Sequence, residues 1–295
     1  MTKLLLMLMM VGVWSGCGKE IEVVKEEEGD IEYEVYRDET NNKPIKHGYY
    51  KVYHPNKSYK VVGKFKDGKQ DGKWVSYNET GQIILESNYK DGKLEGKVVG
   101  YYENGQVKEE GNYKDGEKDG KWSWYYESGK VKLKGNFVDG KIEGKSVSYY
   151  ESGNTKAEGY YKEGNGKLVG YYESGKVEWE GNYVDDKRAG KWVSYYESGE
   201  VKLEENYVDN NQEGKWVEYY KSGKVKKEGN YVEGKSAGTV VLYYESGKMK
   251  GEGICIDGKL EGKSVSYDED GNITDEDIWK DGVCVEMCEG DEEED

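Results

Sequence analysis

The residue types that could do chemistry are few in this chain, and they lie far apart. The two histidines, His47 and His54, flank the strand-like segment GYYKVY. A metal site would need further ligands at a recognisable spacing, and none is patterned near them. We therefore expect both histidines on the surface or at a sheet edge, and we predict no metal and no cofactor.

The four cysteines divide into one near the start of the chain, Cys17, and three near its end, Cys255, Cys284 and Cys288. The motif CVEMC has three residues between its cysteines and no second pair or histidine after it, which disfavours zinc. In an exported protein, a disulfide from Cys255 to Cys284 or Cys288 would pin the terminal hairpin. Free thiols are the alternative.

Carboxylates recur in the motif YYESG, at Glu127, Glu173, Glu197 and Glu245. They could form acid/base pairs or a calcium ladder, but each precedes a turn glycine, where polar residues are favoured. The frequent GK pairs are not phosphate loops, because no glycine cluster follows a strand and opens a helix. Regular repeats leave no unique deep pocket, so we predict no catalytic residue and no enzyme activity.

Composition excludes several classes of partner. The net charge is -16, which disfavours nucleic acid and, by charge alone, anionic lipid surfaces. Hydrophobic residues make up 35%, and there are 29 Tyr against 2 Phe. Because tyrosine joins a large apolar ring to a polar tip, this choice indicates surfaces that are buried on one side and wet at the edge.

The start of the chain has the pattern of a targeting segment. Lys3 precedes the apolar run 4–14, and small residues follow just before Cys17. The run is too short to span a bilayer and matches the apolar region of a signal peptide. The segment resembles a bacterial lipoprotein signal, although Trp14 stands where that family usually has leucine. The resemblance implies cleavage before Cys17, a lipid on Cys17 and a place at the cell envelope. A secreted or a cytoplasmic chain is the alternative.

The elements that would position any site come from an internal repeat. A glycine that precedes KW or its equivalent recurs every 24 residues, with one step of 22. We call it the marker glycine. An aromatic residue follows each marker by seventeen positions, with Cys255 as the exception, and DG or a relative follows by nineteen and twenty. The markers are Gly48, Gly72, Gly96, Gly120, Gly144, Gly166, Gly190, Gly214, Gly238 and Gly262.

This repeat predicts β-hairpins. DG and SGK supply the left-handed backbone positions of tight turns, and the runs between them are rich in Trp, Val and Tyr. In the unit that starts at Gly120, Trp122, Trp124 and Tyr126 share one face of a strand. Gly135, on the apolar face of the next strand, leaves a hollow where a neighbouring aromatic ring could lie flat.

The predicted fold is all-β, an elongated single-layer antiparallel sheet of about ten repeated hairpins. We expect a signal peptide over 1–16, a lipid-anchored acidic tether over 17–46, the repeat array over 47–283 and an acidic tail over 284–295. A first strand could begin near Ile31. The end units leave open strand edges, so edge-to-edge pairing of two copies is conceivable.

The segment EGNYKDGEKDGKW, residues 110–122, resembles the MORN repeat, and the added YYENGQVK hairpin resembles its bacterial variant. That variant occurs in proteins grouped as YwqK-type antitoxins of toxin–antitoxin systems. The resemblance implies an elongated single-layer antiparallel sheet, a role as scaffold or interaction module, and no catalytic residue.

Three functions follow as hypotheses. The first is a non-enzymatic scaffold, anchored to the membrane by its N-terminal lipid, that binds a protein partner. The second is an antitoxin that neutralises a toxin by direct binding. The third is glycan or cell-wall binding through an aromatic ladder, which packing within the sheet would equally explain. The ladder residues share one repeat position and are Trp74, Trp122, Trp192 and Trp216.

Overall fold

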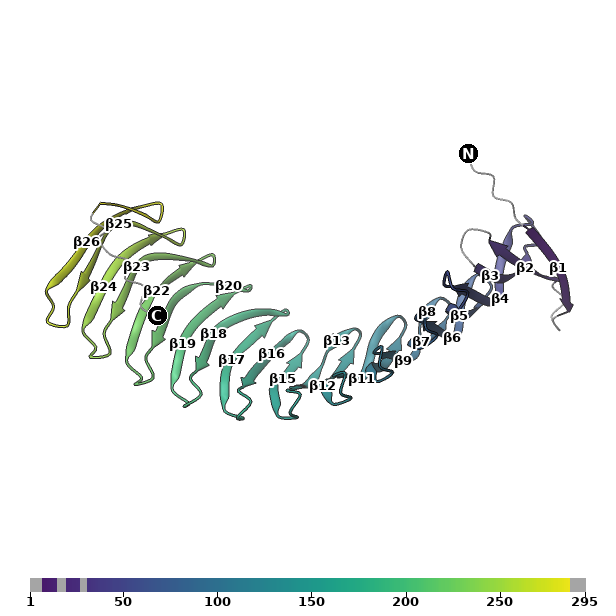
Figure 1. Ribbon diagram of the computed structural model, residues 1–295, viewed down its shortest axis with the longest axis horizontal. Helices are drawn as coiled ribbons and strands as arrows, with labels where there is room; N and C mark the ends of the chain where they lie inside the picture. Colours follow the sequence, from purple (N-terminus) through teal and green to yellow (C-terminus); the bar gives the residue numbers. More distant parts are fainter. Residues whose placement is uncertain (1–6, 15–19, 27–30, 287–295) are drawn as a thin grey trace. The chain divides into compact units, whose positions relative to one another are not determined.

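The computed structural model describes residues 7–14, 20–26 and 31–286. The chain divides into two compact units, Met1–Gly153 and Asn154–Asp295. In each unit the strands follow one another as a series of hairpins (Figure 1). The described residues form strands and turns, and no helix among them is long and apolar enough to cross a membrane.

The strands of the first unit are β1 Met7–Trp14, β2 Glu20–Glu26, β3 Ile31–Arg37, β4 Pro44–Tyr53, β5 Tyr59–Lys66, β6 Lys69–Tyr77, β7 Ile83–Lys90, β8 Lys93–Leu94, β9 Gly96–Tyr101, β10 Val107–Lys114, β11 Glu117–Tyr125, β12 Val131–Val138, β13 Lys141–Ile142 and β14 Gly144–Tyr149. The strands of the second unit are β15 Thr155–Lys162, β16 Asn165–Tyr171, β17 Val177–Val184, β18 Lys187–Tyr195, β19 Val201–Val208, β20 Asn211–Gln212, β21 Gly214–Tyr219, β22 Val225–Val232, β23 Lys235–Tyr243, β24 Met249–Ile256, β25 Lys259–Tyr267, β26 Ile273–Lys280 and β27 Val283–Glu286.

Within each unit the strands pair antiparallel with their neighbours in the chain, as in β10 with β11 and β11 with β12. Three strand positions are split into two pieces that pair with the same neighbour; β8 and β9, for example, both pair with β7. The predicted all-β fold, an open antiparallel sheet of repeated hairpins, is confirmed within each unit.

The DG turns adopt the geometry that the sequence predicts. Asp115 and Gly116, between β10 and β11, have φ angles of 54° and 94°. Two left-handed residues in succession twist the chain in the sense that the flanking strands need. The N–H of Gly116 also donates a hydrogen bond of 2.9 Å to the carbonyl of Leu94 in the preceding hairpin. The turns therefore join neighbouring repeats as well as the two strands of one hairpin.

At most marker glycines the strand pair contains a β-bulge, and at Gly96, Gly144 and Gly214 the strand is split instead. Between β10 and β11, Glu110 pairs with Ser123 and Asn112 pairs with Asp119. Three residues, 120–122, thus lie opposite the single residue Gly111. The bulge begins at Gly120, whose φ of 68° is strained for a residue with a side chain. Its effect is to bring Trp122 against Gly111.

The one 22-residue step has a structural explanation. Tyr161 pairs with Gly166, Gly159 with Leu168 and Glu158 with Val169, without a shift in register. The two absent residues are therefore those that form the bulge in other repeats. Because two residues are lost rather than one, the inward and outward faces of the strand are preserved.

The N-terminal strands correct the predicted tether. β2 and β3 lie within the segment 17–46 and pair with each other, and β3 pairs with β4. β3 begins at Ile31, where a first strand was expected. Val35 is 1% exposed, so this segment contributes to the core of the sheet. β1, within the predicted signal peptide, pairs with β2, and Cys17 lies outside the described residues.

Candidate functional site

The tryptophans of the repeat pack against glycines on the neighbouring strand. A Cβ atom added to Gly111 would lie 2.2 Å from the ring of Trp122, so the indole occupies the space of the missing side chain. The indole Nε1 donates a 3.0 Å hydrogen bond to the carbonyl of Asn112. The predicted hollow above a glycine is thus real, and it is filled from within the chain. The same arrangement recurs in the pairs Gly63–Trp74 and Gly181–Trp192.

The proposed aromatic ladder is largely buried. The exposed fractions are 6% for Trp74, 2% for Trp122, 8% for Trp192 and 7% for Trp216. These indoles therefore form the core of one face in each unit, which we call the aromatic face, and they offer a partner little contact area. This corrects their interpretation as a contact ladder: a side chain used to cover its own sheet is not free to cover a ligand.

Trp216 is the exception within this group. Its glycine is replaced by Glu205, which accepts hydrogen bonds from Tyr207 and Gln212. The Nε1 atom of Trp216 is buried, and no residue in the described part of the chain accepts a hydrogen bond from it. An acceptor equivalent to the carbonyl of Asn112 is therefore not reached once the glycine is lost.

Cations cover parts of the aromatic face. The ammonium of Lys118 lies 4.3 Å from the ring centre of Trp122 and 4.9 Å from that of Trp124. The guanidinium of Arg188 lies 4.7 Å from the ring centre of Trp192. Both cations stand two positions before a marker glycine. Such contacts stabilise the pair and shield the ring from outside.

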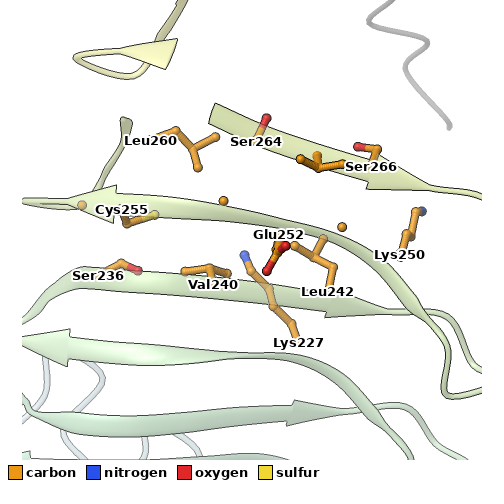
Figure 2. Close-up of a pocket in the computed structure, with 14 residues that line it drawn as sticks. Lys227, Ser236, Val240, Leu242, Lys250, Glu252, Cys255, Leu260, Ser264 and Ser266 are labelled. Atoms are coloured by element: carbon orange, nitrogen blue, oxygen red, sulfur yellow. The ribbon is translucent and has the colours of Figure 1, made fainter. Parts of the chain in front are cut away.

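A hollow on the aromatic face lies over β23, β24 and β25. It has a volume of about 440 Å³ (Figure 2). Residues at the repeat's ring-bearing positions are small here. Ser264 stands where four other units have tryptophan, and Cys255 where all other units have an aromatic residue. Gly251 stands where the unit at Gly120 has Leu133. The hollow is thus the space of side chains that this repeat lacks.

The walls of the hollow are apolar and its rim is polar. Val240 and Leu242 of β23 line one side and Leu260 of β25 the other, with β24 between them (Figure 2). The hydroxyls of Ser264 and Ser266 supply hydrogen-bonding groups. Two lysines and one glutamate complete the charged lining: Lys227, Lys250 and Glu252. An apolar recess with a few polar groups and this volume suits a ring or a small group of side chains.

The opposite face, which we call the polar face, carries a repeated charge network. Glu180 accepts hydrogen bonds from Tyr195, at 2.8 Å, and from Lys167, at 2.6 Å. Lys167 and Tyr195 together lower the pKa of Glu180. Burial and the bond to Glu180 raise the pKa of Tyr195 to about 12. The same triad recurs as Lys97–Glu110–Tyr125 and Lys215–Glu228–Tyr243.

A second network joins consecutive repeats. The hydroxyl of Tyr196 donates a 2.7 Å hydrogen bond to the carbonyl of Tyr219 in the next unit. Sequence inspection did not reveal this bond, although its signal, a tyrosine six residues after most markers, was present. Equivalent bonds are made by Tyr102, Tyr126, Tyr172, Tyr220 and Tyr244.

The histidines are structural. The Nε2 atom of His54 lies 2.9 Å from the carbonyl of Tyr77, so His54 takes the place of the bridging tyrosine in its repeat. His47 contacts Asp67 and packs edge-on against Tyr36. In the part of the chain that the structure describes, no three His, Cys, Asp or Glu side chains gather to hold a metal ion.

The cysteines differ from the predicted pairing. Cys255 has a free thiol, whereas Cys284 is disulfide-bonded. Cys288 lies outside the described residues. A bridge between Cys255 and Cys284 would have to cross from β24 to β27, a distance of three strand spacings or roughly 14 Å. A disulfide requires Cα atoms less than about 7 Å apart, so this pair is too far separated.

The comparisons agree with the repeat. The model of the MORN repeat variant matches residues 70–91, 94–115, 118–139, 142–163, 188–209, 212–233 and 238–254. It passes over 164–187, the unit that begins without a bulge. A search of curated proteins found no match. The seven matched segments cover just over half of the chain, and the chain therefore belongs to the MORN repeat variant family.

Proposed function

We propose that this protein is a non-enzymatic repeat scaffold that binds a protein partner through the hollow over β23–β25. The observation that carries the proposal is the hollow itself, about 440 Å³, at repeat positions where small residues replace rings. A second hollow of about 290 Å³, beside Trp179 and Trp192, is lined by rings that are present. On the polar face, titratable side chains that could take part in chemistry form triads that recur from repeat to repeat, as at Glu110 and Glu180. Repetition of this kind favours a structural role for them.

The occupant that fits the hollow is an aromatic side chain of the partner. Gly253 stands opposite a bulge, as Gly111 does, but the position of Trp122 is taken by Ser264. A ring supplied by a partner would regain the packing that Trp122 makes with Gly111. The lining carries two lysines, Lys227 and Lys250, against the single Glu252, and this positive balance favours a carboxylate next to that ring.

Binding of an aromatic probe tests the proposal. N-acetyl-tryptophanamide is titrated into the full chain while amide resonances are followed by NMR. We expect shifts at Gly251, Gly253 and Cys255. The variant Cys255→Tyr restores the ring that this repeat lacks, so it should abolish the shifts. The matched variant Cys255→Ser keeps the hollow open and should retain them. Equal shifts in all three proteins, or none in the wild type, would contradict the proposal.

We also propose that the scaffold lies at the cell envelope, where a lipid on Cys17 holds it. The support is the apolar run 4–14 and the small residues before Cys17. Mass measurement of the mature protein from its native host tests this part separately. A chain that starts at an acylated Cys17 is expected. A soluble chain that starts at Met1 would overturn the anchor and favour the antitoxin alternative.

A further inference from the structure

A row of exposed aliphatic side chains crosses the polar face of the second unit. Each is the last residue of a strand, before the turn, and stands eighteen positions after its marker glycine. Their exposed fractions are 48% for Val184, 58% for Val208, 52% for Val232 and 56% for Ile256. We call this row the aliphatic ridge. Consecutive members lie two strands apart, which places them roughly 9.6 Å from each other.

The ridge is not required by the fold. The same repeat position is lysine at Lys66, Lys90 and Lys114 of the first unit, where Val138 is the one aliphatic residue. In the second unit it is also lysine on either side of the ridge, at Lys162 and Lys280. These lysines end strands of the same kind, as in β5, β7 and β10. A position that tolerates lysine in several hairpins does not need an aliphatic residue for packing within the sheet. Four successive aliphatic residues therefore indicate an external contact.

A recess lies between two of the exposed side chains of the ridge. A hollow of about 300 Å³ lies between Val232 and Ile256, with Ala237 in its lining. Most other units have a larger residue before the marker, as at Glu213 and Glu261, while Ala189 is the other alanine. The small side chain of Ala237 thus creates a hole beside the exposed side chains, which form knobs. Knobs and holes on one surface can interdigitate with a second copy of that surface.

The charges beside the ridge are also self-complementary. Lys187 pairs with Asp209 at 3.3 Å, and Lys235 pairs with Asp257 at 3.4 Å. Positive and negative side chains alternate along the turns. A second copy related by two-fold symmetry would therefore bring its lysines toward the aspartates of the first. A second copy also has the same spacing between knobs. An amphipathic helix is a less suitable partner. Its apolar side chains recur every seven residues, roughly 10.5 Å, and would not match the spacing of the ridge along the whole row.

We propose that two copies of this chain associate through their aliphatic ridges, face to face and not through strand edges. With two-fold symmetry, Val232 of each copy enters the hollow between Val232 and Ile256 of the other copy. Four half-exposed side chains cover less than the roughly 800 Å² per partner of a standard interface. The dimer is consequently weak and concentration-dependent.

Sedimentation equilibrium of the full chain over a wide range of concentration tests the proposal. We expect reversible dimerisation in the wild type. The variant Val232→Lys copies the residue of the first unit and should weaken association about tenfold or more. The substitution adds a positive charge to a chain whose net charge is -16. It therefore reduces the overall repulsion between two copies, and repulsion cannot explain weaker dimerisation.

The control is Ile273→Lys, which adds the same charge at an aliphatic side chain of similar exposure, 56%, away from the ridge. It should dimerise like the wild type. A monomer at every concentration would overturn the proposal. Equal weakening by both substitutions would also overturn it, because the ridge would then have no special role.

Discussion

The indole of Trp122 occupies the place that a side chain on Gly111 would need, with a ring atom 2.2 Å from the position of the absent Cβ. The bulge at Gly120 sets this contact by placing three residues opposite one. The bulge at Gly120, the absent side chain of Gly111 and the ring of Trp122 therefore act together. It gives a single sheet a packed face without a second layer.

Gly111→Ala should destabilise the first unit by about 1–3 kcal/mol, because the added methyl forces the buried ring to move. The measurement is chemical denaturation followed by tryptophan fluorescence. Gly135→Ala is the matched control, since Gly135 occupies the same repeat position opposite Ser146. A Cβ there meets its nearest atom at 3.6 Å, an ordinary contact. Similar losses in both variants would show that backbone freedom, and not the indole, explains the glycine.

Deletion of Gln70 and Asp71 should give a folded protein. The shortened segment FKDGKGKW would match YKEGNGKL of the natural 22-residue step, with Trp74 directly opposite Gly63. We expect a loss of less than about 3 kcal/mol, measured by thermal unfolding monitored with circular dichroism.

The control for this deletion is removal of Asp71 alone. A strand that slips by one residue moves its apolar side chains to the wet face. Loss of cooperative unfolding is therefore expected for the single deletion. If the single deletion proved the milder of the two, the role assigned to the bulge would be wrong.

Stability should fall at both ends of the pH range. The raised pKa of Tyr195, about 12 against 10.0, means that its contribution is full below pH 10 and is lost as pH rises toward 12. The pKa of Glu180 is lowered from 4.5, so its contribution is present above that pH and is lost as the pH falls below it. Urea unfolding at a series of pH values measures both limbs.

Tyr195→Phe should reduce the alkaline limb, because it removes the proton whose loss breaks the bond to Glu180. Tyr49→Phe, at a 51% exposed tyrosine of the first unit, is the comparison and should leave the limb unchanged. An alkaline limb that is identical in wild type and Tyr195→Phe would exclude this triad as its source.

Much of the fold was predictable because it depends on local signals. The dipeptide Asp115–Gly116 predicts its turn, and the alternation of Lys121 and Trp122 predicts the two faces. The hollow above a strand glycine was also predictable, since Trp and Gly recur at a fixed offset. Each of these features is determined by residues that are adjacent in sequence or lie on the next strand of the hairpin.

The features that escaped prediction depend on register. The sequence does not show whether Gly120 begins a strand or forms a bulge inside one. The bulge, with its positive φ at Gly120, was therefore not predicted. The fixed offset of Trp and Gly predicts a hollow, but without the bulge it does not show that Trp192 fills the hollow at Gly181 and is buried there. The pairing predicted for Cys255 failed because spacing along the chain does not count the strands that intervene. The candidate hollow could have been found from Ser264 and Cys255, the small residues at ring-bearing positions.

The hydrogen bond from Tyr196 to the carbonyl of Tyr219 has a consequence for inheritance. Its donor and acceptor belong to successive repeats, and the turn N–H of most hairpins likewise bonds to the hairpin before it. Excision or duplication of one whole 24-residue segment recreates both bonds between the new neighbours. Recombination within such a gene can therefore lengthen or shorten the product by whole hairpins, and each product keeps a complete set of partners at the join.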